Sequence, residues 1–325
     1  MCGIAGILKF EGAHRIGHDL FQMATCLQHR GADSAGVTVF TSACDSPAHE
    51  YSCLQVALPQ GAPMPDETTI VALGANRLSD IGIERGGFFA RLNDDAPLAT
   101  SDAPIAVSDA PIATRNRSNS LADAALVRRL EEALPGATVS SLGRKMRVHK
   151  TVGRVEELES QMEAMSGTHG IAHLRLATES RIDAAHAQPF WGRPFSDIAV
   201  THNGHITNYL KLRRQFEARG FSFASHNDSE IIGVFLGDKM ESGMTFLESL
   251  QAAGRELDGS FSFIAATANA LGVARDALAT KPLLFVENQA GVALASEPQA
   301  LYHVLGPDIT IREIKPRETR VWELA

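Results

Sequence analysis

The chain opens with Met1-Cys2-Gly3-Ile4-Ala5-Gly6-Ile7, in which a cysteine directly follows the first methionine. If Met1 is removed, Cys2 becomes the N-terminal residue and carries both a thiol and a free α-amine. That amine has an ordinary pKa of ~7.7–8.0, so it can accept the thiol proton directly or through one water molecule. One residue then supplies a nucleophile and its base. The apolar residues that follow predict a buried strand, which would hold Cys2 inside the molecule.

The composition is that of a globular protein without nucleic-acid or membrane partners. The chain has 325 residues, 44% of them hydrophobic and 21% charged, which is enough for one large domain or two smaller ones. The net charge is −8 and no basic tract is present, which argues against nucleic acid and anionic lipid as partners. No apolar run approaches the ~18 residues of a membrane-spanning helix, and the first residues do not resemble a signal peptide. We therefore expect a cytoplasmic protein.

The cysteine pattern predicts neither disulfides nor a metal site. Cys2, Cys26, Cys44 and Cys53 form no C-x-x-C pair, and no histidine cluster lies beside them at metal-ligand spacing. Few, unpaired cysteines are typical of a reducing compartment. Cys26 is interpreted as a small buried hydrophobic residue.

Four further motifs follow the N-terminal one. The first, residues 29–36, reads His-Arg-Gly-Ala-Asp-Ser-Ala-Gly and lies between a predicted helix and an apolar strand. The second, residues 170–178, reads Gly-Ile-Ala-His-Leu-Arg-Leu-Ala-Thr, and the third ends a predicted strand with His202-Asn203-Gly204. An Asn-Gly pair is also common in hairpin turns, but residues 208–220 have a helical pattern and not that of a returning strand. The fourth, residues 225–230, opens a predicted helix.

In this order the five motifs resemble those of the class II glutamine amidotransferases, which are N-terminal-nucleophile hydrolases. The resemblance covers about two-thirds of the chain. It implies an α+β fold, a four-layer αββα sandwich in which two antiparallel sheets lie face to face with helices outside. Residues 1–325 would form one domain of this kind, with Cys2 at the end of a central strand.

The resemblance also implies which residues carry out the reaction. Cys2 would attack the side-chain amide of glutamine, and the side-chain amide of Asn203 with the backbone N–H of Gly204 would bind the resulting oxyanion. Because the α-amine of Cys2 serves as the base, His202 and His205 need no catalytic role.

Four other residues would bind the substrate. Arg175 would form a bidentate contact with the α-carboxylate of glutamine, assisted by Thr178. Asp228 would pair with the α-ammonium, although an aspartate there is also a good helix N-cap. Arg30 would lie near the nucleophile and help to close the pocket.

Residues 41–167 are interpreted as a large insertion. Residues 95–114 repeat a seven-residue unit with a proline in each copy, which excludes a coiled coil and predicts an extended or disordered loop, taken as residues 93–118. Ser120 is then the expected N-cap of a helix over 121–134. Short strands are expected at 137–142 and 146–149, and residues 66–73 fit either a helix or a strand.

The expected reaction is hydrolysis of L-glutamine to glutamate and ammonia through a γ-glutamyl thioester on Cys2. Leu176 and Glu179 depart from the hexosamine-phosphate branch of the family, and the chain is more similar to stand-alone glutaminase-like subunits of glutamate-synthase-type complexes, including N-methylglutamate synthase. No acceptor domain is recognisable in the sequence. The resemblance thus implies a flavin-dependent partner subunit that holds FMN, with no cofactor or metal in this chain.

Two other functions remain open from the sequence. The chain could be a catalytically silent structural or regulatory subunit of such an assembly, although its motif residues are intact. It could also be an N-terminal-cysteine hydrolase that acts on another amide, although Arg175 and Asp228 favour an amino-acid substrate.

Overall fold

Two antiparallel sheets form the centre of the computed structural model, which describes residues 2–41, 52–59, 61–74, 77–84, 87–92, 112–177 and 181–324. In the described residues the first sheet has the strand order β15 (Arg312–Glu313), β13 (Leu284–Asn288), β14 (Gly291–Ala295), β1 (Gly3–Lys9), β8 (His169–Arg175), β2 (Ser34–Phe40) and β7 (Met146–Val152). The second has the order β16 (Thr319–Glu323), β12 (Ala270–Arg275), β11 (Gly259–Thr267), β10 (Ile198–Ile206) and β9 (Phe190–Trp191).

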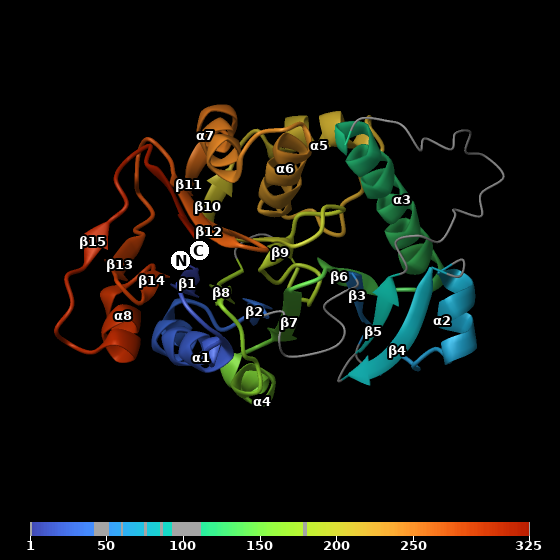
Figure 1. Cartoon of the computed structure of the whole chain (residues 1–325), viewed down its shortest axis with the longest axis horizontal. Helices are drawn as coiled ribbons and strands as arrows, with labels where there is room; N and C mark the ends of the chain where they lie inside the picture. Colours follow the sequence, from blue (N-terminus) through green and yellow to red (C-terminus); the bar gives the residue numbers. More distant parts are fainter. Residues whose placement is uncertain are drawn as a thin grey trace.

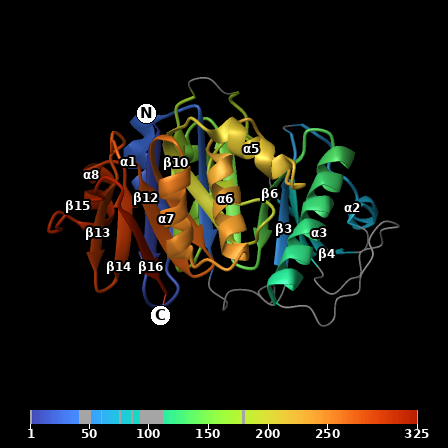
Figure 2. The same cartoon turned by 90° about the horizontal axis from the view of Figure 1, so that it is seen from above.

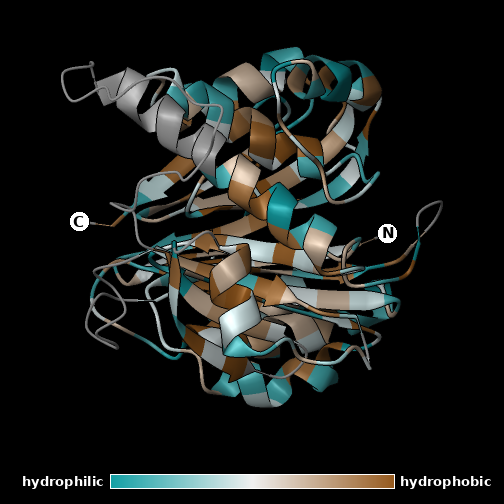
Figure 3. Cartoon of the chain, turned by 90° about the vertical axis from the view of Figure 1, so that its right-hand side faces the viewer, coloured by the Kyte–Doolittle hydropathy of each residue, from teal (hydrophilic) through white to brown (hydrophobic). Residues whose placement is uncertain are grey.

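Helices cover the outer face of each sheet, so the predicted four-layer αββα sandwich is confirmed (Figures 1 and 3). The first sheet is covered by α1 (Ile16–Leu27), α4 (Glu159–Glu163) and α8 (Pro298–Leu305), with the short 3₁₀ helices η1 (Gln28–Arg30) and η3 (Val155–Leu158) beside them. The second sheet is covered by α5 (Tyr209–Glu217), α6 (Glu230–Glu241) and α7 (Phe246–Glu256).

Strand β1 lies in the middle of the first sheet because both of its faces are apolar. Ile4 and Leu8 belong to the core between the two sheets, where Ile264 of β11 faces them. Ala5 and Ile7 belong to the core under α1. Gly3 to Leu8 are all buried, and β1 pairs with β14 on one side and β8 on the other. The residue before this strand, Cys2, is therefore held at the end of a central strand, as predicted.

The insertion builds a third sheet beside the sandwich (Figure 2). Among the described residues its strand order is β4 (Leu78–Glu84), β5 (Gly87–Leu92), β3 (Ser52–Ala57) and β6 (Thr138–Gly143), and it is accompanied by α2 (Glu67–Leu73) and α3 (Ile112–Ala133). The insertion does not remain separate from the sandwich, because its last strand, β7, pairs along the whole of β2.

The structure decides or corrects three expectations about the insertion. The segment that fitted either a helix or a strand is α2, and the Asp66 side chain accepts the N–H of Thr69 as its N-cap. Helix α3 begins at Ile112, so the predicted extended loop is wrong for residues 112–118, and Ser120 lies inside the helix instead of capping it. An uninterrupted helix after the last proline outweighs the weak capping signal of a single serine. The rest of the predicted loop, residues 93–111, lies outside the described residues.

One aspartate joins the insertion to the second sheet. The side chain of Asp197, just before β10, accepts the backbone N–H groups of Arg144, Lys145 and Met146 at 2.9–3.0 Å. Arg144 and Lys145 form the turn between β6 and β7, and Met146 is the first residue of β7. A carboxylate that satisfies three neighbouring backbone donors fixes that turn against the sandwich.

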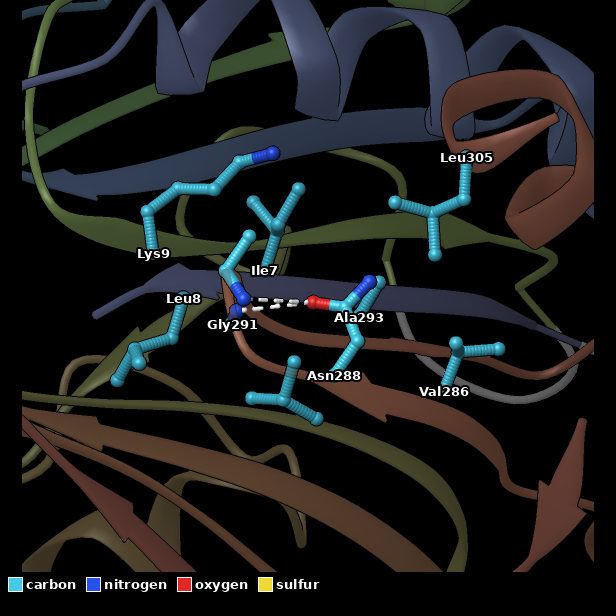
Figure 4. A pocket seen from close by; sticks show the side chains of 10 residues that line it. Ile7, Leu8, Lys9, Val286, Asn288, Gly291, Ala293 and Leu305 are labelled. Atoms are coloured by element: carbon cyan, nitrogen blue, oxygen red, sulfur yellow. Dashed lines mark hydrogen bonds between the residues drawn. The ribbon is translucent and has the colours of Figure 1, made fainter. Parts of the chain in front are cut away.

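A small pocket lies at the far end of β1 from Cys2 (Figure 4). It has a volume of about 30 Å³ and is lined mainly by apolar side chains, including Ile7, Val286 and Leu305. Asn288 accepts the N–H groups of Ala290 and Gly291 at its edge, so the polar group is already paired. Lys9 also lines the pocket, and its Nζ lies 3.4 Å from Oδ2 of Asp19, so the charged group of the lining is paired as well.

Candidate active site

Cys2 lies where the two sheets of the sandwich meet. Its backbone carbonyl accepts one hydrogen bond from Arg30 Nε at 3.0 Å and another from Asn203 Nδ2 at 3.2 Å. Arg30 follows α1 on the side of the first sheet, whereas Asn203 belongs to β10 of the second sheet. Donors from both sides of the sandwich therefore fix the backbone of Cys2.

The thiol of Cys2 is half-buried and is surrounded by cationic groups. Its Sγ lies 3.9 Å from the carbonyl oxygen of Leu176, to which it donates a weak hydrogen bond. Burial raises the pKa of the Cys2 thiol above its usual value, while the Leu176 carbonyl contact and the charges of Arg175 and Arg30 act in the opposite direction. A buried thiol of this kind needs a nearby base to become a thiolate.

Asn203 and Gly204 lie in the last part of β10, beside Cys2, and the strand continues past the predicted end to Ile206. An asparagine side-chain nitrogen has two N–H donors, so Asn203 can bind the Cys2 carbonyl and keep one donor for a ligand. Gly204 is exposed, and its backbone φ of +141° lies in a region that favours glycine. A Cβ at this position would lie 2.0 Å from the carbonyl oxygen of Ser260, so only glycine fits. Helix α5 follows β10, so the hairpin interpretation is excluded.

Arg175 ends β8 and is 3% exposed. In the register of the first sheet its neighbour is Ser34, and Leu174 lies opposite Gly3, which places Arg175 next to the nucleophile. Its Nη1 donates to the carbonyl oxygen of Arg181 at 2.7 Å. Burial lowers the pKa of Arg175, but a guanidinium stays charged at any physiological pH, so a cation faces the region of Cys2.

Asp228 lies on the same side of β10 as the proposed oxyanion donors. Its Oδ2 accepts the backbone N–H of Ile206 at 2.7 Å and lies 3.4 Å from Nδ1 of His205. Its Oδ1 accepts the hydroxyl of Ser229 at 3.3 Å. The N-cap of α6 is Ser229, so the alternative role of Asp228 as the N-cap is wrong. Asp228 is anchored to β10 instead, close to Gly204.

The structure thus brings together most of the residues that the sequence singled out. Cys2, Arg30 and Asn203 are joined by direct hydrogen bonds, and Arg175 acts on the Cys2 thiol through its charge. Thr178 lies outside the described residues. Among the described residues, no cluster of three or more His, Cys, Asp or Glu side chains could hold a metal ion. Within the same ranges, no helix has the length and apolar character that crossing a membrane requires.

Sequence reasoning missed two acidic residues near the site. Asp33 accepts the backbone N–H of Ala177 at 2.7 Å, and its own N–H donates to the carbonyl of Arg175, so it fixes the chain just after β8. Glu297 forms an ion pair with Arg30. Asp33 belongs to the 29–36 motif and Glu297 to none of the five motifs, and the partners of both residues are distant in the chain, so no local pattern reveals them.

Comparison with known proteins places this site in a family. A model of the glutamine amidotransferase domain matches residues 173–303, a range that contains Arg175, Asn203, Gly204 and Asp228. A putative glutamine amidotransferase of Methanothermobacter thermautotrophicus is 32% identical over 327 residues, with 100% of both chains covered. The chain belongs to the glutamine amidotransferase family. The glutamine amidotransferase-like protein GlxB of Rhizobium meliloti is a further relative of this amidotransferase, 30% identical over 99% of this chain and 95% of GlxB.

Solved structures share the fold of this amidotransferase. The Bacillus subtilis glutamine phosphoribosylpyrophosphate amidotransferase matches 99% of the chain with a TM-score of 0.58 at 18% identity. A structure described as the allosteric regulatory enzyme of purine biosynthesis matches with a TM-score of 0.60, also at 18% identity. The chain corresponds to 47% of each of these proteins, so the likeness concerns the fold alone.

Proposed function

We propose that this amidotransferase hydrolyses L-glutamine to L-glutamate and ammonia through a γ-glutamyl thioester on Cys2. The observation that carries the proposal is the hydrogen bond from Asn203 Nδ2 to the carbonyl of Cys2. It supports the proposal because an amide with one N–H to spare lies beside a thiol, where negative charge would develop on a substrate amide oxygen. Gly204 would supply the second donor from its backbone N–H.

The proposed steps use only groups of this chain, glutamine and water. After Met1 is removed, the α-amine of Cys2 takes the thiol proton, and the thiolate attacks the side-chain amide carbon of glutamine. The tetrahedral intermediate then expels ammonia, to which the ammonium group returns the proton. Water hydrolyses the thioester, which releases glutamate and restores the thiol.

We propose that one charged side chain binds the α-carboxylate of glutamine and another, of opposite charge, binds its α-ammonium. Arg175 would bind the α-carboxylate, because a buried guanidinium beside the nucleophile offers a planar pair of donors. Asp228 would bind the α-ammonium, Thr178 would assist Arg175, and Arg30 would help to close the pocket.

The ammonia is proposed to pass to a flavin-dependent partner subunit of the glutamate-synthase or N-methylglutamate-synthase type, which would hold FMN. The support comes from the motif pattern, in which Leu176 follows Arg175 as in that branch of the family. The complex would lie in the cytoplasm, as the composition indicates.

The test combines intact mass with steady-state kinetics on protein purified from its native host. We expect a chain that begins at Cys2 and forms glutamate from glutamine, with a rate that rises when the co-purifying flavin subunit is added. Cys2→Ser should abolish the activity, whereas the control Cys26→Ser, at the other half-buried free cysteine in the described residues, should retain it. Full activity with Met1 retained would contradict the base role of the α-amine.

The same assay separates the two alternatives. No glutamine turnover by a chain with a verified N-terminal cysteine, alone or with its partner, would indicate a silent subunit. A much higher kcat/KM for an uncharged amide than for glutamine would indicate a different hydrolase.

A further inference from the structure

Glu297 lies just before α8 and binds two residues of the 29–36 motif. Its carboxylate forms an ion pair with Arg30 Nη1, and its Oε2 lies 3.0 Å from Nε2 of His29. The adjacent Ser296 fixes this position relative to β1: its hydroxyl accepts the N–H of Ile4 at 3.2 Å, and its own N–H donates to the Ile4 carbonyl at 2.9 Å. Glu297 is therefore anchored to the strand that carries the nucleophile.

Arg30 connects Glu297 to the nucleophile. While Nη1 pairs with Glu297, Nε of the same guanidinium donates to the carbonyl of Cys2 at 3.0 Å. The Arg30 side chain is 8% exposed, and its third nitrogen, Nη2, is buried with no hydrogen-bond partner among the described residues. Glu297 and Cys2 are thus the partners that hold this cation in place.

The rigid guanidinium explains why the ion pair matters for Cys2. Because the guanidinium is planar, a carboxylate that fixes Nη1 also sets the direction of the Nε–H bond. An arginine without that carboxylate has several alternative rotamers and gains free energy by turning its charge toward water. The Cys2 carbonyl would then keep only the donor from Asn203, on the opposite side of the sandwich.

We propose that Glu297 is a positioning residue for the nucleophile: it holds Arg30 on the Cys2 carbonyl and thereby fixes Cys2 between its two donors. This role goes beyond the proposed glutaminase mechanism and rests on it for the kinetic part of the test. Glu297 acts on Cys2 through Arg30 and has no role in the proposed chemical steps.

The test compares Glu297→Ala and Glu297→Gln with a matched control, Glu131→Gln. Glu131 pairs with Arg193 at 2.5 Å, and the two pairs have similar burial: the arginines are 8% and 3% exposed, and each glutamate is 21% exposed. We expect kcat for glutamine to fall about 10–100-fold in Glu297→Ala with KM within about twofold, because misplaced reacting groups slow the reaction more than they weaken binding. Glu297→Gln, whose amide oxygen can still accept from Arg30, should lose less, and the control should keep its kcat.

A second measurement does not depend on glutamine. The rate at which iodoacetamide alkylates Cys2, followed by peptide mass spectrometry across pH, gives the pKa of the thiol in each variant. If Arg30 moves away in Glu297→Ala, the Cys2 pKa rises, because the Arg30 charge is one of the influences that lower it. If Arg30 stays without Glu297, removal of the negative charge makes the Cys2 pKa fall.

The outcomes distinguish this inference from the proposed function. A rise in the Cys2 pKa supports the positioning role even if the wild type proves unable to hydrolyse glutamine, which would defeat only the proposed function. An unchanged or lower Cys2 pKa in Glu297→Ala, or a kcat equal to that of the control in an active enzyme, would overturn the inference. Melting temperatures show whether Glu297→Ala is folded, and Glu297→Gln carries the test if it is not.

Discussion

Acidification from pH 7 to pH 5 should destabilise this protein through two buried histidines of β8. His169 and His173 are both essentially unexposed, and burial lowers their pKa values to about 4 and about 3. The ring of His169 is stacked on Phe40 and contacts the carbonyl oxygen of Thr267 at 2.7 Å. The ring of His173 interacts with the backbone of His202, which raises its pKa, but burial outweighs that contact. Both rings are thus neutral in the folded state at pH 5.

The direction and the magnitude of this pH effect on stability follow from proton linkage. In the unfolded chain each ring has a pKa of ~6.5, so at pH 5 the unfolded state binds protons that the folded state does not, and stability falls as the pH falls. Between pH 7 and pH 5 each histidine should lower the free energy of unfolding by ~2 kcal/mol, and the two together by ~4 kcal/mol. The pKa of His202 is also lowered by burial, which adds to the loss in the same direction.

The assay is urea unfolding at pH 7 and pH 5 for the wild type, His169→Gln and His173→Gln. Glutamine does not titrate. Between pH 7 and pH 5 the free energy of unfolding of each variant should therefore fall by ~2 kcal/mol less than that of the wild type, whatever the variant's stability at pH 7. The comparison cancels the contribution of the carboxylates, which all three proteins share. If His173→Gln loses as much stability as the wild type between the two pH values, His173 is not held neutral and the reasoning fails.

Three substitutions at the site give further predictions. Arg175→Lys should raise KM for glutamine much more than it lowers kcat, because a lysine cannot form the two-pronged carboxylate contact; an unchanged KM would argue against that assignment. Asn203→Ala should lower kcat by ~10²–10³ if its amide binds the oxyanion, and steady-state kinetics with kcat intact would exclude it. Gly204→Ala should lower both activity and melting temperature, because the added Cβ would lie 2.0 Å from the carbonyl oxygen of Ser260. The control Gly254→Ala is in an open position on α7 and should raise the free energy of unfolding by ~0.5–1 kcal/mol. A melting temperature of Gly204→Ala equal to that of the wild type would contradict the steric argument.

The part of the site that lies on strand ends was predictable from the sequence. Cys2, Arg175 and Asn203 each stand next to a short apolar run with a recognisable motif, and both strand and motif appear where the sequence placed them. The layers of the fold were predicted by the resemblance to the class II glutamine amidotransferases, and the apolar runs agree with them: β1 has one apolar face for the core between the sheets and another for the core under α1.

Contacts between distant segments could not be predicted. Glu297 and Arg30 are separated by 267 residues, and Asp228 binds the backbone of Ile206 through geometry that only the packed structure defines. The start of α3 was also predicted wrongly, because the proline-containing repeat favoured an extended loop up to residue 118, whereas the helix begins at Ile112. Local sequence patterns indicate the secondary structure that a segment prefers. These features depend instead on which segments pack against each other in the folded chain.

The pairing of β7 with β2 decides what would happen if the insertion were removed. Strand β7 follows β6 by a short turn, and the two strands belong to different sheets. A chain shortened by residues 41–167 would keep β2 but lose every hydrogen bond that β2 makes to β7, from Ser34 to Phe40. The exposed edge of β2 would be free to pair with the same edge of another copy, so the shortened protein should self-associate. The insertion thus moves the edge of the larger sheet from β2, which is buried throughout, to the more polar β7.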